Sequence, residues 1–123
     1  MDYEKQLNEI IGREGKEFEI KYSPLEDDSY PVYGNIEIGN MPGLIGYLIA
    51  LRGDNLFIND LMTISTVEKK NLEVVLNINE SLAKEFNCSS ITVEGGEEEI
   101  KSFYETQGYQ FGEGKYVGGK NIK

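Results

Sequence analysis

The sequence predicts a single α/β domain over residues 1–123, with a mixed, mostly antiparallel sheet flanked by helices. Residues 32–64 contain several strand-like runs separated by turn residues, which is the pattern of consecutive hairpins. A long run with helical periodicity then precedes a short β-prone run, which is the order of a strand–helix–strand crossover. A chain of 123 residues with 39% hydrophobic residues suffices for one continuous core.

A helix, a strand and a loop are predicted before the hairpins. Apolar residues recur at helical spacing over residues 2–13, which predicts a short amphipathic helix. Apolar and charged residues alternate over residues 18–22, which predicts a half-buried strand that ends at Ser23 and Pro24. The polar residues 25–31 end in a second proline and predict a surface loop.

The hairpin region predicts three strands in quick succession, over residues 32–38, 44–51 and 56–64. The segments between them are rich in Gly, Asn, Asp and Pro, which are the residues that tight turns require. Because these separators are short, we expect the strands to pair as antiparallel hairpins.

The second half of the chain predicts a crossover and a terminal hairpin. Residues 72–86 have helical periodicity and form the longest predicted helix, and Asn87 can adopt the left-handed conformation that ends it. Residues 89–93 predict a short strand. Three consecutive glutamates then favour the start of a third helix, which ends before Gly108. The glycine-rich residues 109–123 predict a hairpin.

Composition excludes several classes of function. With 12 basic and 22 acidic side chains the net charge is −10, so we expect neither nucleic acid nor a membrane as a partner. The absence of histidine excludes Ser–His–Asp and Cys–His catalysis and, with a single cysteine, argues against a metal site. We expect that cysteine, Cys88, to be a buried apolar residue.

No apolar run has the length of a signal peptide or a membrane span, so a cytoplasmic protein is expected.

Two short segments, taken with this order of elements, resemble the GNAT superfamily of N-acetyltransferases. Residues 58–63, I-N-D-L-M-T, are similar to the family's fourth strand, which is often E-D-L-Y-V. Residues 102–109, S-F-Y-E-T-Q-G-Y, resemble the F-Y-x-x-x-G-F segment near its end. The resemblance covers residues 32–118. It departs from the family in residues 66–73, which lack the glycines of the R/Q-x-x-G-x-G/A loop, and at Glu97, where an Asn is common.

The resemblance implies an enzyme that moves an acetyl group from acetyl-CoA to an amine of a small molecule or protein by direct attack. Acetyl-CoA would lie between the fourth and fifth strands. Tyr104 would be the general acid that protonates the leaving thiolate, and Asp60 the base that deprotonates the amine, with Glu94 as a second candidate base. The cofactor-binding residues that it implies are Met62, Thr63, Ile64, Lys69, Lys70, Asn71 and Leu72.

Other interpretations of these residues stay open. Tyr104 could pack in the core as the i+4 partner of Ile100. Asp60 could be a polar residue at a strand edge or in a bulge. Lys69 and Lys70 could assist a pyrophosphate at the start of the long helix or belong to a solvated face.

A second hypothesis for the function is a catalytically inactive domain of the same fold that acts as an acidic protein-binding module. It follows from the missing glycines and from Ser65 and Glu68, which have the S-x-x-E spacing of a capping box. Such a box would occupy the helix amides that a pyrophosphate needs. A homodimer is also left open.

Overall fold

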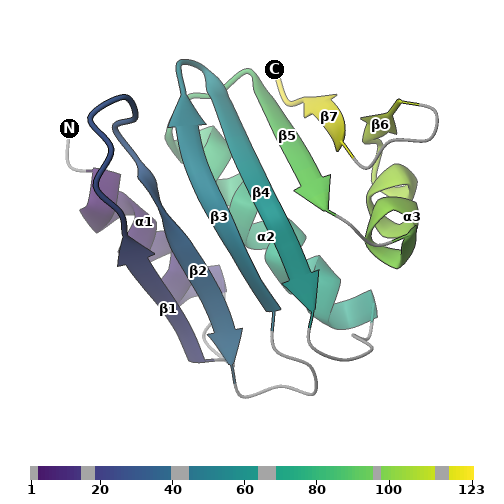
Figure 1. The fold of residues 1–123 in the computed structure, drawn as a ribbon, viewed down its shortest axis with the longest axis horizontal. Helices are drawn as coiled ribbons and strands as arrows, with labels where there is room; N and C mark the ends of the chain where they lie inside the picture. Colours follow the sequence, from purple (N-terminus) through teal and green to yellow (C-terminus); the bar gives the residue numbers. More distant parts are fainter. Residues whose placement is uncertain (1–2, 15–18, 40–44, 64–68, 96–97, 113–116) are drawn as a thin grey trace.

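The computed structural model describes residues 3–14, 19–39, 45–63, 69–95, 98–112 and 117–123, and for residues 45, 60–63, 69–71 and 95 it describes the backbone alone. Seven strands form one sheet in the order β1-β2-β3-β4-β5-β7-β6 (Figure 1). The elements in chain order are α1 (Tyr3–Glu14), β1 (Glu19–Pro24), β2 (Tyr33–Gly39), β3 (Ile45–Arg52), β4 (Asn55–Thr63), α2 (Lys69–Glu85), β5 (Ser90–Gly95), α3 (Glu98–Thr106), β6 (Gln110–Phe111) and β7 (Val117–Asn121).

The predicted fold class is confirmed. The strands β1 to β4 pair in sequence as antiparallel neighbours, and β7 pairs antiparallel with both β5 and β6. Among the described strands, β4 and β5 make the one parallel pair. A parallel pair needs a crossover connection, and α2 supplies it. The sheet is therefore mixed and mostly antiparallel, with its parallel pair near the centre.

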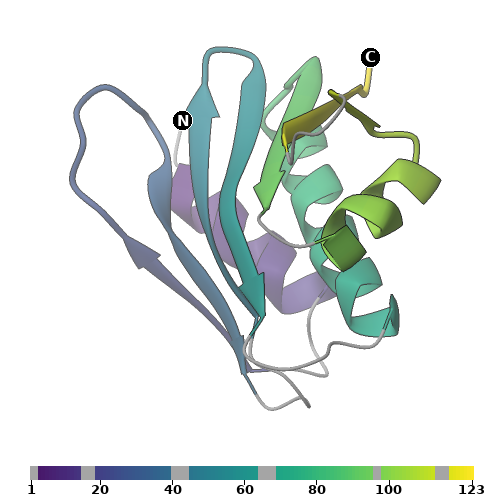
Figure 2. The same ribbon diagram turned by 45° about the vertical axis from the view of Figure 1, so that its right-hand side comes forward.

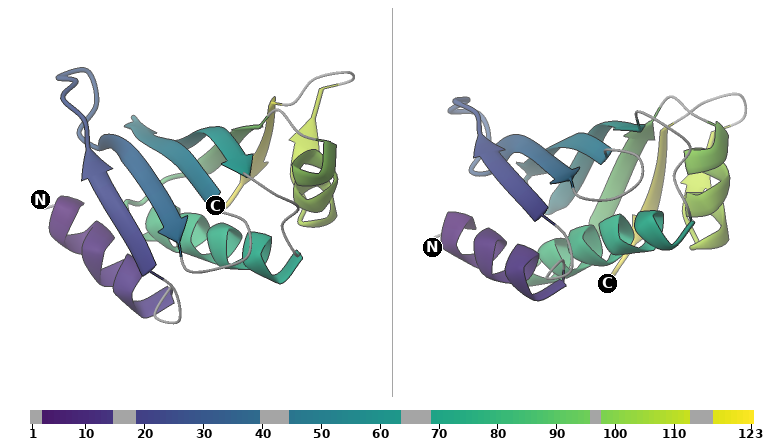
Figure 3. Two further views of the ribbon diagram at one scale, coloured as in Figure 1. Left: turned by 60° about the horizontal axis from the view of Figure 1, so that its bottom comes forward. Right: turned by 90° about the horizontal axis from the view of Figure 1, so that it is seen from below.

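The helices α1 and α2 lie side by side on the same face of the sheet (Figures 2 and 3). Alternate residues of the strands point to that face and are fully buried, among them Ile36 on β2, Ile49 on β3 and Leu56 on β4. Leu7 from α1 and Leu82 from α2, each 0% exposed, pack against them. The core thus fills the space between the sheet and one layer of helices.

The opposite face of the central strands has no helix over it in the part of the chain that the structure describes. The third helix, α3, lies at the β6 end of the sheet (Figure 3). Polar side chains on the uncovered face bond to one another: Asn55 Nδ2 donates to Ser90 Oγ at 2.9 Å and to Thr92 Oγ1 at 3.0 Å. These bonds tie β4 to β5 from the solvent side.

The end of α2 confirms the prediction made for Asn87. Its φ is 59°, in the left-handed region, where Asn is tolerated better than most residues. The Asn87 amide donates to the Lys84 carbonyl at 3.1 Å, and the Cys88 amide donates to the Ala83 carbonyl at 2.8 Å. This is the Schellman arrangement that satisfies the last carbonyls of a helix. Cys88 is 1% exposed, as expected for a small apolar residue.

Candidate functional site

A β-bulge interrupts β4 at its centre. Between Asn59 and Met62 the strand advances three residues while its neighbour β3 advances two, from Leu48 to Gly46. The pairing with β5 shifts over the same stretch of β4. Ile58 pairs with Val93 and Leu61 pairs with Gly95, so β4 again advances three residues while its neighbour advances two. One extra residue therefore interrupts both ladders at once. A bulge frees local backbone groups and re-aims side chains, and such bulges occur often next to active sites.

Three polar side chains meet on the helix-covered face beside this bulge. Tyr47 comes from β3, at the residue where the register with β4 shifts. Its hydroxyl donates to the Asn79 Oδ1 of α2 at 3.1 Å. Tyr104 from α3 adjoins the Asn79 amide, which lowers the pKa of the Tyr104 hydroxyl. Tyr47, Asn79 and Tyr104 are 3%, 2% and 1% exposed, so this polar cluster lies inside the core.

Tyr47 and Tyr104 are both phenols, but the Tyr47 hydroxyl already donates to Asn79, so Tyr104 is the candidate acid of this cluster. Burial raises the pKa of its hydroxyl, the charge of Glu80 raises it further, and Asn79 offsets only part of that rise. The hydroxyl therefore stays protonated at neutral pH. Within the described residues neither Tyr104 Oη nor Asn79 Nδ2 has a hydrogen-bond partner. Leaving a buried polar group unpaired costs about 1–3 kcal/mol, which makes both atoms candidates for contact with a ligand or a water.

An ion pair and an aromatic ring border the cluster. Lys120 Nζ of β7 lies 3.4 Å from Glu80 Oε2 of α2. The Tyr109 ring packs edge-on against the Tyr104 ring, with 4.9 Å between the ring centroids, and Lys120 Nζ lies 5.6 Å from the Tyr109 centroid. The ion pair is partly exposed and so adds little stability. Its effect on the site is that the carboxylate of Glu80 stays next to the cluster.

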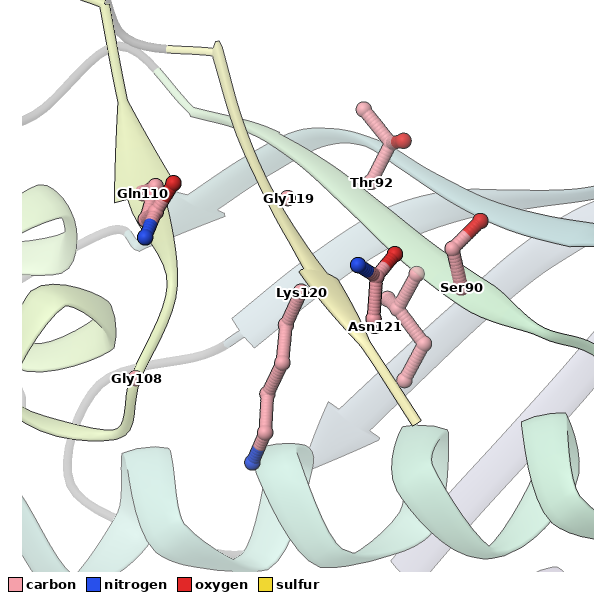
Figure 4. Close-up of a pocket in the computed structure, with 8 residues that line it drawn as sticks. Ser90, Thr92, Gly108, Gln110, Gly119, Lys120 and Asn121 are labelled. Atoms are coloured by element: carbon pink, nitrogen blue, oxygen red, sulfur yellow. The ribbon is translucent and has the colours of Figure 1, made fainter. Parts of the chain in front are cut away.

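A polar hollow of about 550 Å³ lies over β5 and β7, next to β6 (Figure 4). Ser90, Thr92, Asn121 and Gln110 contribute hydroxyl and amide groups to its wall. Lys120 is directed toward α2, on the other side of β7 (Figure 4). Such a lining suits a polar ligand held by neutral hydrogen bonds.

A second hollow, of about 230 Å³, lies on the uncovered face of the sheet. Tyr30 and Tyr33 stack with their centroids 5.6 Å apart on one side of it. On the other side the Arg52 guanidinium lies 3.9 Å from the centroid of the Phe57 ring. This aromatic surface is separate from the buried cluster.

The structure brings together only part of the predicted site. Tyr104 lies in the buried cluster, and the interpretation of Asp60 as a bulge residue agrees with the backbone, although its side chain lies outside the described part of the chain. Met62 pairs with Gly46 just beyond the bulge, and Thr63 is the last residue of β4.

The remaining predicted cofactor residues surround the start of α2. Ile64, Ser65 and Glu68 lie outside the described residues, so neither the pantetheine contact nor the capping box is described. Lys69 begins α2, and Lys70 and Asn71 follow it, with only their backbone described. Leu72 is 5% exposed and packs in the core. Glu94, the second candidate base, is exposed at the end of β5.

Sequence reasoning did not connect Tyr47 and Asn79 with Tyr104. Asn79 occupies a position of α2 that faces the core, among apolar residues at helical spacing. An amide at such a position is an identifiable signal, because a buried polar side chain needs a partner. The partner, Tyr47, lies 32 residues away in sequence, so periodicity could not indicate it.

The fold and the site together define a single-sheet α/β protein in which a bulged central strand adjoins a buried tyrosine. The chain matches no family model, no curated protein and no solved structure. None of the helices in the described ranges has the length and apolar character that crossing a bilayer requires.

The buried tyrosines predict alkaline lability. Burial raises the pKa values of Tyr47, Tyr104 and Tyr109 above the 10.0 of a free phenol. In the unfolded chain these groups ionise near pH 10, whereas in the fold they stay neutral, so the stability that they contribute is complete below about pH 10 and falls as pH rises further. Ultraviolet titration of tyrosinate should show these three of the eight tyrosines ionising only as the protein unfolds. Ionisation of all eight while circular dichroism stays native would contradict this.

Proposed function

We propose that the protein is an N-acetyltransferase that transfers the acetyl group of acetyl-CoA to an amine of a small molecule or protein. One observation carries the proposal: Tyr47 lies opposite the bulge of β4 and bonds to Asn79, which in turn adjoins the buried hydroxyl of Tyr104. The bulge offers backbone groups outside the ladder, and the tyrosine offers a proton. An acyl transfer needs both of these.

The residues around the bulge suit the parts of acetyl-CoA. Beyond the bulge, the main chain of Met62, Thr63 and Ile64 would hold the pantetheine arm. The start of α2, with Lys69 and Lys70, would attract the pyrophosphate, because helix N-termini and cations both favour an anion. In this proposal Asn71 and Leu72 contribute backbone amides, with the side chain of Leu72 anchored in the core.

The reaction would need no covalent enzyme intermediate. The amine nitrogen attacks the thioester carbonyl carbon, the carbon–sulfur bond breaks, and the sulfur leaves as a thiolate. Tyr104 gives the thiolate a proton, and Asp60 or a water takes the proton that the amine releases. An acceptor that arrives as a cation is favoured by the net charge of −10.

Calorimetric titration with acetyl-CoA tests the proposal. We expect a micromolar or tighter dissociation constant, which corresponds to about −8 kcal/mol or better, and a rise in melting temperature with ligand concentration. Lys70→Glu should weaken binding about tenfold, whereas Lys21→Glu, an equal charge change on the exposed face of β1, should not alter it. Absence of both heat and thermal shift at millimolar acetyl-CoA would refute the proposal.

A catalytically inactive protein-binding domain is the second candidate. The observation that favours it is the uncovered face of the sheet, where aromatic residues such as Tyr33 and Phe57 line a hollow. The net charge of −10 suits a basic partner. If acetyl-CoA fails to bind, salt-dependent binding of a polylysine peptide would support this function, and sedimentation velocity would show whether a homodimer forms.

A further inference from the structure

The polar hollow over β5 and β7 groups hydrogen-bonding side chains that the proposed transfer chemistry does not use. Its volume of about 550 Å³ is within the range of small-molecule sites, which is about 300–1,000 Å³. Ser90 and Thr92 of β5 pair with Asn121 and Gly119 of β7, and Gly119 also pairs with Gln110 of β6. Cross-strand partners share one face of a sheet, so these residues line the hollow from the same side (Figure 4).

Asn55 holds the two hydroxyl groups of the hollow in place. One N–H of its amide donates to Ser90 Oγ at 2.9 Å and the other to Thr92 Oγ1 at 3.0 Å. Its Oδ1 accepts from Arg52 Nη2 at 3.3 Å, which orients the amide. A hydroxyl that accepts one hydrogen bond keeps its own proton and a second lone pair. Ser90 and Thr92 can therefore each donate to a ligand and also accept from it.

The hollow presents neutral groups. Lys120 is the one charged side chain among the described residues that line it. That side chain is directed toward α2, where its Nζ lies 3.4 Å from Glu80 Oε2 (Figure 4). The described lining thus offers neither a cation for a phosphate or carboxylate nor a carboxylate for a cation. The net charge of −10 further disfavours anions. The ligand that fits is therefore uncharged.

Gly119 leaves the middle of the hollow open. A Cβ there would lie 3.2 Å from the Ile91 carbonyl oxygen and 3.9 Å from Thr92 Oγ1, so a larger side chain would occupy the space between Thr92 and Gln110. A glycine in a strand allows a ligand to approach closely. Both β5 and β7 pair with strands on either side, so a peptide cannot join them as a further strand. The ligand is held by side chains.

We propose that this hollow binds a neutral saccharide, with a sugar ring over Gly119 and its hydroxyl groups bonded to Ser90, Thr92, Asn121 and Gln110. Each sugar hydroxyl both donates and accepts hydrogen bonds, and so do the hydroxyl and amide groups of this lining. The site does not depend on the proposed transferase activity, because none of these residues belongs to the proposed acetyl-CoA site.

Nuclear magnetic resonance on the full isotope-labelled chain tests this inference. The probes are neutral oligomers of glucose, galactose, mannose, xylose and N-acetylglucosamine, each added up to about 10 mM, so that weak binding is detected. We expect at least one of them to shift the amide signals of the residues that line the hollow, and excess acetyl-CoA to leave those shifts unchanged. The proposal is overturned if none of the oligomers shifts these signals, or if acetyl-CoA displaces the one that does. Failure of acetyl-CoA to bind counts against the transferase function alone.

Matched glutamine variants separate this site from general effects of truncation. Gln110 is exposed, so Gln110→Ala should fold normally and should weaken the saccharide about tenfold by removing its hydrogen bonds. Gln107→Ala makes the same change just after α3, outside the described lining, and should leave the affinity unchanged. Equal affinity of Gln110→Ala and the parent protein would overturn the proposal.

Thr92→Val tests the hydroxyl that Asn55 holds. Valine keeps the branched shape of threonine and suits a strand, but it offers no hydrogen bond. We expect the saccharide to bind about tenfold more weakly, with the lining signals of the free protein otherwise in place. A well-folded Thr92→Val protein with unchanged affinity would show that this hydroxyl does not contact the ligand, which contradicts the proposed site.

Discussion

Replacing Tyr104 by phenylalanine is expected to lower acetyl transfer about 100-fold, the lower end of what a positioned acid contributes. The free energy of unfolding should change by less than about 1 kcal/mol, because the hydroxyl bonds to no described protein group and the ring stays in place. Loss of turnover without loss of stability separates a chemical role from a packing role. The measurements are the initial rate of CoA release with a panel of amines and urea denaturation of the same samples.

Tyr22→Phe is the matched control for that experiment. It removes one phenolic hydroxyl near the β1 edge, far from the cluster in the sheet order, and should leave the rate of CoA release unchanged. If Tyr104→Phe retains the full rate, Tyr104 is not the acid. If it instead unfolds the protein, the hydroxyl has a structural partner that the described residues do not include.

The second large effect is expected for Gly34→Ala, which should lower the free energy of unfolding by about 1–3 kcal/mol. A Cβ at Gly34 would lie 2.6 Å from the carbonyl oxygen of Ser23 and 2.6 Å from Cε1 of Tyr22. The carbonyl belongs to the backbone of β1, which pairs with β2 and cannot retreat without disturbing that pairing. Urea denaturation followed by circular dichroism measures the loss.

Gly12→Ala is the control for the same chemical change. Gly12 lies inside α1 with open space around the position of a Cβ, so alanine should stabilise the protein by about 0.5–1 kcal/mol through better helix propensity. Opposite signs for the two glycines would show that the contact at Gly34, rather than glycine itself, matters. A Gly34→Ala protein as stable as the parent would mean that β1 moves away from β2 easily.

Local sequence patterns predicted the elements of this fold well. The helical spacing of residues 2–13 and 72–86 corresponds to α1 and α2, and the left-handed Asn87 ends α2 where its residue type indicated. These features depend on residues within a few positions of one another. Backbone geometry and turn chemistry are therefore enough to determine them.

Only part of the candidate site could be predicted from the sequence. The F-Y-x-x-x-G-Y segment drew attention to Tyr104, but the sequence left open whether its hydroxyl would be buried or lie at the edge of the core. The bulge at Asp60 was one of several interpretations, because a bulge is defined only by how two neighbouring strands pair with β4.

Periodicity and turn residues thus determined the order of helices and strands and the mixed sheet, and the absence of histidine excluded histidine chemistry. They could not indicate that α1 and α2 share one face, or that Tyr47 and Asn79 meet Tyr104 in the core. Those features arise from packing between residues far apart in the chain. A buried hydrogen bond such as that from Tyr47 to Asn79 forms only after the sheet and helices have come together, so no local pattern encodes it.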